Sequence, residues 1–303
     1  MRLAVTGATG FVGKRFVQHA LEVGAEIVAL VRNPAVCTLP RHPLLVVEGW
    51  RLGEPLPATG RVDAVCHFAA YIPANFDDPG EARACFETNT LSVLGLVADS
   101  AAQGAGHFVY LSSGQIYRPG GPAADELAAT YPVERATYYL TSKLAGELCV
   151  QAAARRCGLQ ATVLRVASVY GPGMHGGGMI ATFLQRLSSG QPVEVRDGGR
   201  YGVDLVYVDD VVGLAYRAVE HGKSGIFNVG GGRICRAFDV AHTIAAAVDA
   251  APALIAVTGE AHPSGFSALD ISRAERELGY RPMDLEAGLR HWKSVDQLTN
   301  FSR

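Results

Sequence analysis

Short apolar runs alternate with longer stretches of helical character through the first half of the chain. Strands that are buried on both faces of a parallel sheet have this nearly continuous apolar composition. Helices are predicted between the runs, and glycine follows the last of them, as is common at a helix end. The alternation therefore predicts an α/β fold built on a doubly wound parallel sheet. The predicted strands are residues 2–6, 26–31, 63–70, 107–113 and 161–166, and the helices 11–23, 82–102 and 136–157.

The pattern loosens after residue 166, where a glycine-rich segment occupies residues 171–179. Strand and helix patterns resume beyond it, so we interpret this segment as a loop between elements. We expect a main domain over residues 1–166, with residues 203–230 returning to it. A smaller C-terminal lobe is expected from residues 167–202 and 231–303.

Composition disfavours several classes of partner. The 303 residues suffice to bury a large core, and 49% of them are hydrophobic. A formal net charge of -2 gives no basic surface for nucleic acid. We find neither a secretory leader pattern nor an uncharged apolar stretch of the roughly 18–20 residues that span a bilayer. We therefore expect a cytoplasmic protein with a small-molecule substrate and neither a nucleic-acid nor a membrane partner.

The six cysteines are scattered, without a C-x-x-C pair and without clustering near histidine. This spacing indicates neither a zinc site nor a disulfide framework. We expect no metal, and we interpret the cysteines as reduced packing residues. They are Cys37, Cys66, Cys85, Cys149, Cys157 and Cys235.

The first predicted strand leads directly into the sequence TGATGFVG, with glycine at positions 7, 10 and 13. Glycine in such a turn lets the backbone approach a pyrophosphate, and the following helix N-terminus offers unpaired N–H groups. A tight structural turn is the alternative, which the strand before and the helix after disfavour. The motif predicts that residues 1–166 form a dinucleotide-binding domain.

The second predicted strand ends in LVRNP, with Val31 and Arg32 where NAD-binding proteins usually place an acidic residue. A carboxylate would repel a 2′-phosphate, whereas arginine can pair with it. We predict NADP as the cofactor, with NAD as the alternative if Arg32 is only an exposed turn residue. Trp50, near the end of a third strand, would either stack on the adenine or only pack.

A tyrosine pair precedes a lysine in ATYYLTSK, residues 136–143. Residues at i and i+4 share a helix face, which favours Tyr139 over Tyr138 as the partner of Lys143. A nearby ammonium lowers the pKa of a phenol from its usual value near 10 and prepares it for acid–base work. A solvated helix face is the alternative. The segment LSSGQIY, which ends a predicted strand at the ligand-binding edge of the sheet, favours the catalytic interpretation.

Together these motifs resemble the extended short-chain dehydrogenase/reductase family, which includes nucleotide-sugar epimerases, dehydratases and ketoreductases. The resemblance covers almost the whole chain. It implies a Rossmann fold with a smaller C-terminal substrate-binding lobe, and a homodimer formed through helices 82–102 and 136–157. The segments that carry it, besides those above, are DAVCHFAA, TNTLSVLG, LRVASVYGPG, VDLVYVDDV and LDISRAERELGYRP.

The resemblance also implies individual roles. Ser113 would hydrogen-bond the substrate oxygen, Tyr139 would exchange its proton, and Lys143 would also hold the nicotinamide ribose. The expected cofactor contacts, with Arg32 added from its charge, are Gly7, Thr9, Gly10, Phe11, Val12, Gly13, Arg32, Trp50, Ala69, Ala70, Asn89, Tyr139, Lys143, Val166 and Ser168. The expected substrate contacts are Ser113, Gln115, Ser168, His175, Arg200 and His262.

Some positions depart from the family's pattern. Its 4,6-dehydratases have an Asp-Glu pair after the catalytic Ser/Thr, but this chain has Gly114 and Gln115. An amide cannot perform that proton transfer, so we expect oxidoreduction or epimerisation instead. Val203 and His262 stand where nucleotide-sugar members often have diphosphate-binding arginines, and Arg200 or a protonated histidine would have to compensate.

We therefore expect an NADP-dependent oxidoreductase or epimerase acting at a hydroxyl or ketone carbon of a sugar, with a nucleotide-linked sugar as the leading expectation. The alternative enzyme is an NADPH-dependent reductase of a non-nucleotide carbonyl substrate. A cofactor-binding scaffold without catalysis is a third reading, which the intact set of Ser113, Tyr139 and Lys143 disfavours. His67, within a buried run, is expected to be a core residue.

Overall fold

The computed structural model describes residues 1–58, 60–76, 78–119, 121–130, 136–261, 264–296 and 298. The chain forms two compact units. The first consists of Met1–Ile116, Thr130–Arg165 and Val212–Phe227. The second consists of Tyr117–Ala129, Val166–Val211 and Asn228–Arg303.

A seven-stranded sheet forms the centre of the first unit, in the order β10-β6-β5-β4-β1-β2-β3. The pairs that join β1 to β2, β1 to β4, β2 to β3 and β4 to β5 are all parallel. Six of these strands follow the Rossmann order, and the predicted doubly wound α/β fold is confirmed. The strands are β1 (Arg2–Thr6), β2 (Glu26–Val31), β3 (Leu45–Gly49), β4 (Ala64–His67), β5 (His107–Ser113), β6 (Gln160–Val166) and β10 (Gly225–Val229).

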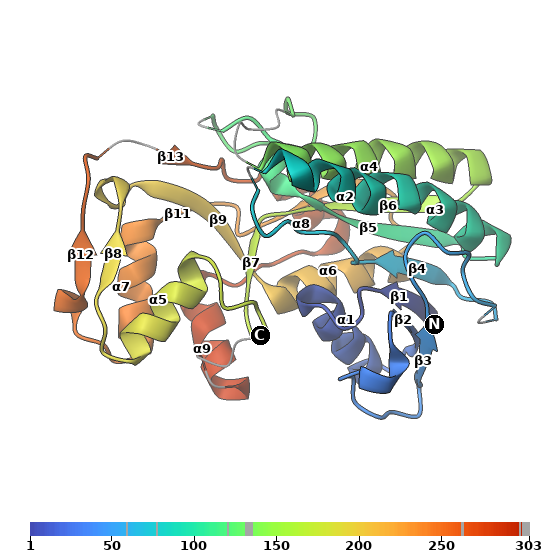
Figure 1. The fold of residues 1–303 in the computed structure, drawn as a ribbon, viewed down its shortest axis with the longest axis horizontal. Helices are drawn as coiled ribbons and strands as arrows, with labels where there is room; N and C mark the ends of the chain where they lie inside the picture. The colour runs from blue at the N-terminus through green and yellow to red at the C-terminus, as the bar shows by residue number, and fades with distance from the viewer. Residues whose placement is uncertain are drawn as a thin grey trace. The chain divides into compact units, whose positions relative to one another are not determined.

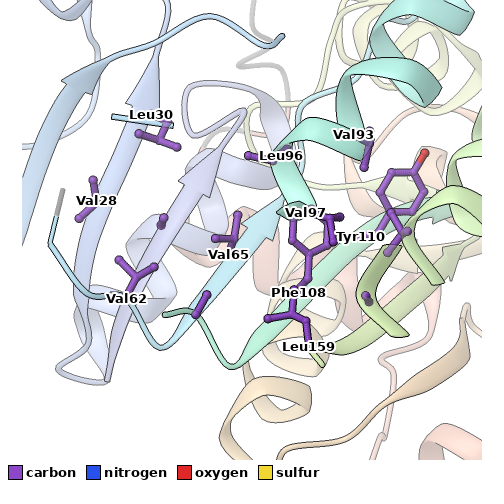
Figure 2. Packing of buried hydrophobic residues seen from close by; sticks show 14 of the residues in the cluster. Val28, Leu30, Val62, Val65, Val93, Leu96, Val97, Phe108, Tyr110 and Leu159 are labelled. Atoms are coloured by element: carbon purple, nitrogen blue, oxygen red, sulfur yellow. The ribbon is translucent and has the colours of Figure 1, made fainter. Parts of the chain in front are cut away.

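Helices cover both faces of this sheet (Figure 1). On one face lie α1 (Phe11–Glu22) and the first unit's part of α6 (Val208–Glu220), whose Tyr216 ring meets His19 of α1 edge-on at 5.6 Å. On the other face lie α3 (Ser92–Ala102) and α4 (Thr137–Cys157). A cluster of buried side chains fills the space beneath them, including Val65, Leu96, Val97, Phe108 and Tyr110 (Figure 2).

The helix predicted over residues 82–102 is confirmed, and it contains a π-helical turn. It consists of α2 (Ala82–Phe86), a π-helical turn (Glu87–Leu91) and α3. The wider π geometry, which the sequence did not predict, surrounds Asn89, whose side chain bonds outside its own helix. The helix predicted over residues 136–157 begins one residue later than predicted, at Thr137. Ala136 has a positive φ of 61° and lies outside α4.

The second unit contains a small sheet around β9 (Tyr201–Tyr207). In it β7 (Ser168–Tyr170) and β13 (Ser264–Gly265) pair with β9 in parallel, and β11 (Ile234–Arg236) pairs antiparallel. A separate parallel pair joins β8 (Val193–Val195) to β12 (Ile255–Val257). The helices that lie wholly in this unit are α5 (Met179–Ser188), α7 (Ala237–Ala247), α8 (Ser272–Leu278) and α9 (Leu285–Val295).

Asp204 joins three segments of the second unit. This buried carboxylate accepts hydrogen bonds from the main-chain N–H groups of Gly231 (2.7 Å) and Leu269 (2.9 Å). Burial raises its pKa to about 6, although the same N–H groups oppose the shift. The carboxylate is therefore a buried support for β9.

All six cysteines are free thiols. Cys66 and Cys85 are buried, but Cys157 is exposed at the end of α4. The packing role expected for all six cysteines is therefore wrong for Cys157. Among the helices that the structure describes, none combines the length and apolar character needed to cross a bilayer.

Candidate active site

The turn after β1 brings three parts of the first unit into close contact. Gly7 has a φ of +66°, and a Cβ at this position would lie 2.6 Å from the main-chain nitrogen of Ala69. A Cβ on Gly13 would lie 2.1 Å from the carbonyl oxygen of Gly7. Side chains at either position would therefore push the turn away from α1 or from the segment after β4. Both glycines are required by this geometry.

The start of α1 suits an anion. Gly10 is the N-cap residue, no side chain caps the helix, and its first turn has no acidic residue. Thr9 and Gly10 are exposed, and Phe11 and Val12 in the first turn are partly exposed. The uncapped N–H groups and the positive end of the helix dipole therefore fit the diphosphate of a dinucleotide.

The carboxyl ends of β1 and β4 lie side by side at the point where the strand order reverses. Open α/β sheets bind ligands at this point. The Thr6 hydroxyl lies 2.8 Å from Nδ1 of His67 and accepts a 3.3 Å hydrogen bond from the Ala69 N–H. These contacts fix the segment leading to Ala69 and Ala70, two expected cofactor residues. They also place His67 in the core, fully buried as predicted.

Arg32 and Trp50 lie in different environments. Arg32 is exposed directly after β2 and pairs with no carboxylate among the described residues. Trp50 is 6% exposed and belongs to the buried cluster between sheet and helices. Its indole Nε1 donates a 3.1 Å hydrogen bond to the Glu54 carbonyl. The packing alternative for Trp50 is therefore the one that this geometry favours.

Tyr139 and Lys143 stand one turn apart on α4, so they share a helix face. Tyr139 is partly exposed and its ring meets Phe76 edge-on at 5.7 Å, whereas Lys143 is 3% exposed. Ser113 ends β5, which packs against α4. Its hydroxyl accepts a 3.2 Å hydrogen bond from the Gln115 N–H and has little exposure, which fixes its direction.

Asn89 connects these elements. Its Oδ1 accepts from the Tyr71 N–H at 2.8 Å, and its Nδ2 donates to the Tyr71 carbonyl and to the Ser142 hydroxyl, both at 3.0 Å. Ser142 in turn donates to the Tyr139 carbonyl at 2.7 Å. Asn89 therefore holds the segment after β4 against the turn of α4 that carries Tyr139. The Asn89 side chain is 1% exposed.

The expected effect of Lys143 on Tyr139 is not found in this structure. Burial raises the pKa of Tyr139 to about 12, and the nearby Cys85 adds to the increase. Burial also lowers the pKa of Lys143 to about 7, against the smaller opposing effect of the Glu147 carboxylate. The prediction of a lowered phenol pKa was wrong here, because removal from water disfavours the charged form of Tyr139.

The remaining predicted residues belong to the second unit or lie outside the described residues. Val166, Ser168, His175 and Arg200 belong to the second unit, with His175 and Arg200 exposed. His262 lies outside the described residues. Val203, at an expected diphosphate-binding position, is 5% exposed on β9 and pairs with Cys235. The roles of these residues stay predictions.

Several residues around the site were not predicted from the sequence. Glu147 continues the series of Tyr139 and Lys143 at the same spacing and is 1% exposed, so the spacing itself was an available signal. Its carboxylate binds Arg165 of β6, and Tyr110 of β5 lies against Lys143. These two contacts join residues far apart in the chain, and no local pattern reveals them.

Comparison with known proteins agrees with this geometry. The model of the NAD dependent epimerase/dehydratase family matches residues 3–230. A UDP-glucose 4-epimerase from Mycolicibacterium smegmatis is 30% identical over 306 residues, covering 93% of this chain and 94% of the relative. A dTDP-4-dehydro-6-deoxy-D-allose reductase from Streptomyces bikiniensis is 26% identical over 306 residues, covering 94% and 93%. The crystal structure of DesIV, a dTDP-glucose 4,6-dehydratase from Streptomyces venezuelae with NAD bound, matches with a TM-score of 0.82 and 25% identity, covering 97% and 98%.

The chain belongs to the NAD-dependent epimerase/dehydratase family, the extended short-chain dehydrogenases/reductases. The resemblance found from the motifs is thus confirmed, as is the prediction that the chain is an enzyme. Members of this family use a nicotinamide dinucleotide, which the glycine turn and the uncapped α1 terminus fit.

Proposed function

We propose that this enzyme transfers hydride at a hydroxyl or ketone carbon of a nucleotide-linked sugar, as a ketoreductase or an epimerase. The observation that carries the proposal is the pair of Tyr139 and Lys143 on one face of α4, which Asn89 holds to the segment after β4. The second unit, built largely from residues 167–202 and 231–303, would be the substrate-binding lobe.

The chain's own residues handle the proton and the orientation. When bound, the nicotinamide dinucleotide supplies or accepts the hydride. In the reducing direction, Tyr139 gives the proton of its hydroxyl to the substrate oxygen, and Ser113 donates a hydrogen bond to the same oxygen. In the oxidising direction, Tyr139 takes that proton back. Lys143 as an ammonium stabilises the tyrosinate and holds the ribose.

NADP is the proposed cofactor, with NAD as the alternative. The exposed guanidinium of Arg32 follows β2 directly, at the place where NAD-binding folds have an acidic residue. The 2′-phosphate of NADP would pair with the Arg32 guanidinium through charge-assisted hydrogen bonds. The 2′-hydroxyl of NAD would form a weaker interaction with the same group.

The substrate class rests on the relatives and on two positions. Relatives named as epimerase, reductase and dehydratase act on UDP- or dTDP-linked sugars. Gly114 and Gln115 follow Ser113 and cannot exchange protons, which supports reduction or epimerisation over 4,6-dehydration. Buried Val203 cannot bind a diphosphate, and this favours the second candidate, an NADPH-dependent reductase of a non-nucleotide carbonyl compound.

A cytoplasmic homodimer is the proposed form of the enzyme. Leu91 and Leu94 are 60% and 40% exposed on the helical segment after α2, and Leu148 is 63% exposed on α4. Large apolar side chains on two adjacent helices are typical of a surface that another protein covers. A second copy of the chain would cover these leucines through the same two helices.

Calorimetric titration of the NADPH-saturated protein with UDP, dTDP, GDP and CDP tests the substrate class. We expect one diphosphate to bind with a dissociation constant on the order of micromolar. Binding would identify the base and show that other groups replace Val203 and His262. If none of the four binds, the nucleotide-sugar proposal is wrong and the non-nucleotide carbonyl reductase takes its place.

A further inference from the structure

Tyr110 of β5 places its ring face against the ammonium of Lys143. The Lys143 Nζ lies 4.5 Å from the ring centroid, inside the range of about 6 Å in which a cation is attracted by an aromatic ring. Tyr110 is 0% exposed and Lys143 is 3% exposed. The attraction is stronger at such a site than at the surface, because little water screens it.

The position of the Tyr110 ring is fixed from two sides. Its hydroxyl donates a 3.0 Å hydrogen bond to the main-chain carbonyl of Asn89 in the π-helical turn. A Cβ on Gly146 of α4 would lie 2.2 Å from the same hydroxyl and 2.5 Å from the Asn89 carbonyl oxygen. Helix α4 can therefore approach β5 this closely only because residue 146 is glycine. The ring is packed among the helices and is not free to turn (Figure 2).

The geometry points to Tyr110 as a positioning residue, whose ring holds the Lys143 side chain as an ammonium facing the active site. Tyr110 acts through Lys143 and is not a catalytic residue. The inference deepens the proposed function, because it explains how a buried lysine keeps the charge that the proposed mechanism requires. The contact itself involves only residues of the first unit.

Other ionisable groups lie near Lys143 or contact its neighbours. From its own helix, Tyr139 lies one turn before it and Glu147 one turn after it. From the sheet, His67 of β4 stacks beside Tyr110, and Arg165 of β6 pairs with Glu147. Cys85 of α2 faces Tyr139.

These groups have different effects on the charge of Lys143. Burial lowers the pKa of Lys143 to about 7, and Glu147 opposes this shift. His67 is neutral in the pH range where Lys143 titrates, because burial lowers the pKa of His67 to about 3. The tyrosine ring and the Glu147 carboxylate thus act together against the cost of burial.

The test measures the charge of Lys143 directly, in the full-length protein without cofactor. The chain has four lysines, at positions 14, 143, 223 and 293. Labelling lysine with ¹³C at Cε should therefore give four NMR signals, and the Lys143→Arg variant identifies the Lys143 signal by its loss. We expect the ε-protons of Lys143 to be shifted upfield by the ring of Tyr110. We also expect the titration midpoint of Lys143 to lie at a lower pH than the midpoints of the other three lysines.

Three variants separate the ring from its surroundings. Tyr110→Phe keeps the ring and should leave the Lys143 titration within about 0.3 pH units of the wild type. Tyr110→Leu removes the ring and should lower the midpoint by about 0.5–1.5 pH units, the equivalent of a buried cation–π contact. Phe108→Leu is the matched control, because Phe108 is equally buried on β5 and borders His67. It should lose stability without shifting the midpoint.

The outcomes decide the inference. A Lys143 midpoint in Tyr110→Leu that is unchanged or raised would overturn it, as would an equal shift in Phe108→Leu. If Tyr110→Leu does not fold, Tyr110→Met replaces it, since methionine fills irregular core space. In the wild type, ε-protons of Lys143 that resonate with those of the other lysines would also contradict the inference. None of these results depends on the substrate, so failure here is distinct from failure of the nucleotide titration.

Discussion

The carboxylate of Glu147 and the guanidinium of Arg165 form a pair that is almost fully buried, one helical turn beyond Lys143. The Arg165 Nη2 lies 2.8 Å from Glu147 Oε2, and its Nε lies 3.1 Å from both carboxylate oxygens. The Arg165 side chain is 6% exposed and the Glu147 side chain is 1% exposed. The pair ties α4 to β6 and places a negative charge behind the proposed catalytic lysine.

Loss of this carboxylate should destabilise the protein strongly. Glu147→Gln leaves the Arg165 charge buried without a counter-ion, so we expect the free energy of unfolding to fall by about 3 kcal/mol. The matched control is Glu286→Gln, which removes the partner of Arg290 from an exposed pair with an N–O distance of 2.6 Å. It should cost less than about 1 kcal/mol. Urea unfolding of both variants measures the difference, and equal losses would refute it.

Lys143 should make stability depend on pH. Its pKa is about 7 in the folded protein, against an ordinary value of 10.5. Between these values the unfolded chain binds a proton that the folded protein lacks, so stability rises with pH through this window. Below about pH 7 the folded protein must bury the charge, and Lys143→Met should then melt about 5 °C higher than the wild type.

Melting curves at pH 6 and pH 9 test this dependence. The advantage of Lys143→Met should shrink at pH 9, where the wild type no longer buries the charge. Lys293→Met is the control, because Lys293 is 60% exposed and has only surface partners, Asp249 at 3.7 Å and the Ala247 carbonyl at 3.1 Å, among the described residues. It should change the melting temperature little at either pH. If the gain in melting temperature of Lys143→Met over the wild type is larger at pH 9 than at pH 6, the predicted direction of the pH dependence is wrong.

Arg32 should decide the choice of cofactor. We expect the wild type to bind NADPH more tightly than NADH. Arg32→Ala should weaken NADPH binding about 10-fold or more by removing a charge-assisted contact, and should leave NADH binding nearly unchanged. Arg41→Ala removes another exposed arginine from the connection between β2 and β3 and serves as the control. Fluorescence titration gives the constants. Tighter binding of NADH by the wild type would exclude the NADP proposal.

Leu148 should contribute to a dimer interface. Leu148→Asp places a charge on α4 where the proposed second copy packs, so we expect a shift from dimer to monomer. Leu127→Asp is the control, because Leu127 is 95% exposed and lies outside the helices. This change should leave the mass of the dimer in solution unchanged. Light scattering coupled to size-exclusion chromatography reports both. A monomeric wild type, or a Leu148→Asp variant that stays dimeric, would argue against this interface.

The parts of the structure that follow from local pattern were predictable from sequence. Buried apolar runs identify the parallel strands, and the glycine spacing identifies the turn in which Gly7 adopts a positive φ. Spacing on α4 alone selects Tyr139 as the partner of Lys143. In each case a rule about neighbouring residues is sufficient.

The parts that depend on packing were not predictable. The π-helical turn around Asn89 lies within a sequence that reads as a regular α-helix, and its Asn89 side chain bonds Tyr71 and Ser142, which lie far away in the sequence. Tyr110 meets Lys143 across 33 positions of sequence, through a contact that only the folded β5 and α4 create. The high pKa of Tyr139 likewise depends on burial, which the motif does not contain.

The central claim is that Tyr139, and not its neighbour, exchanges the proton. Its most direct test compares Tyr139→Phe with Tyr138→Phe, using the sugar linked to the nucleotide that the titration selects. We expect Tyr139→Phe to lower kcat about 10²–10⁴-fold while binding NADPH as the wild type does. Tyr138→Phe should keep nearly full activity. Near-normal turnover by Tyr139→Phe, or a large loss in Tyr138→Phe alone, would contradict the account.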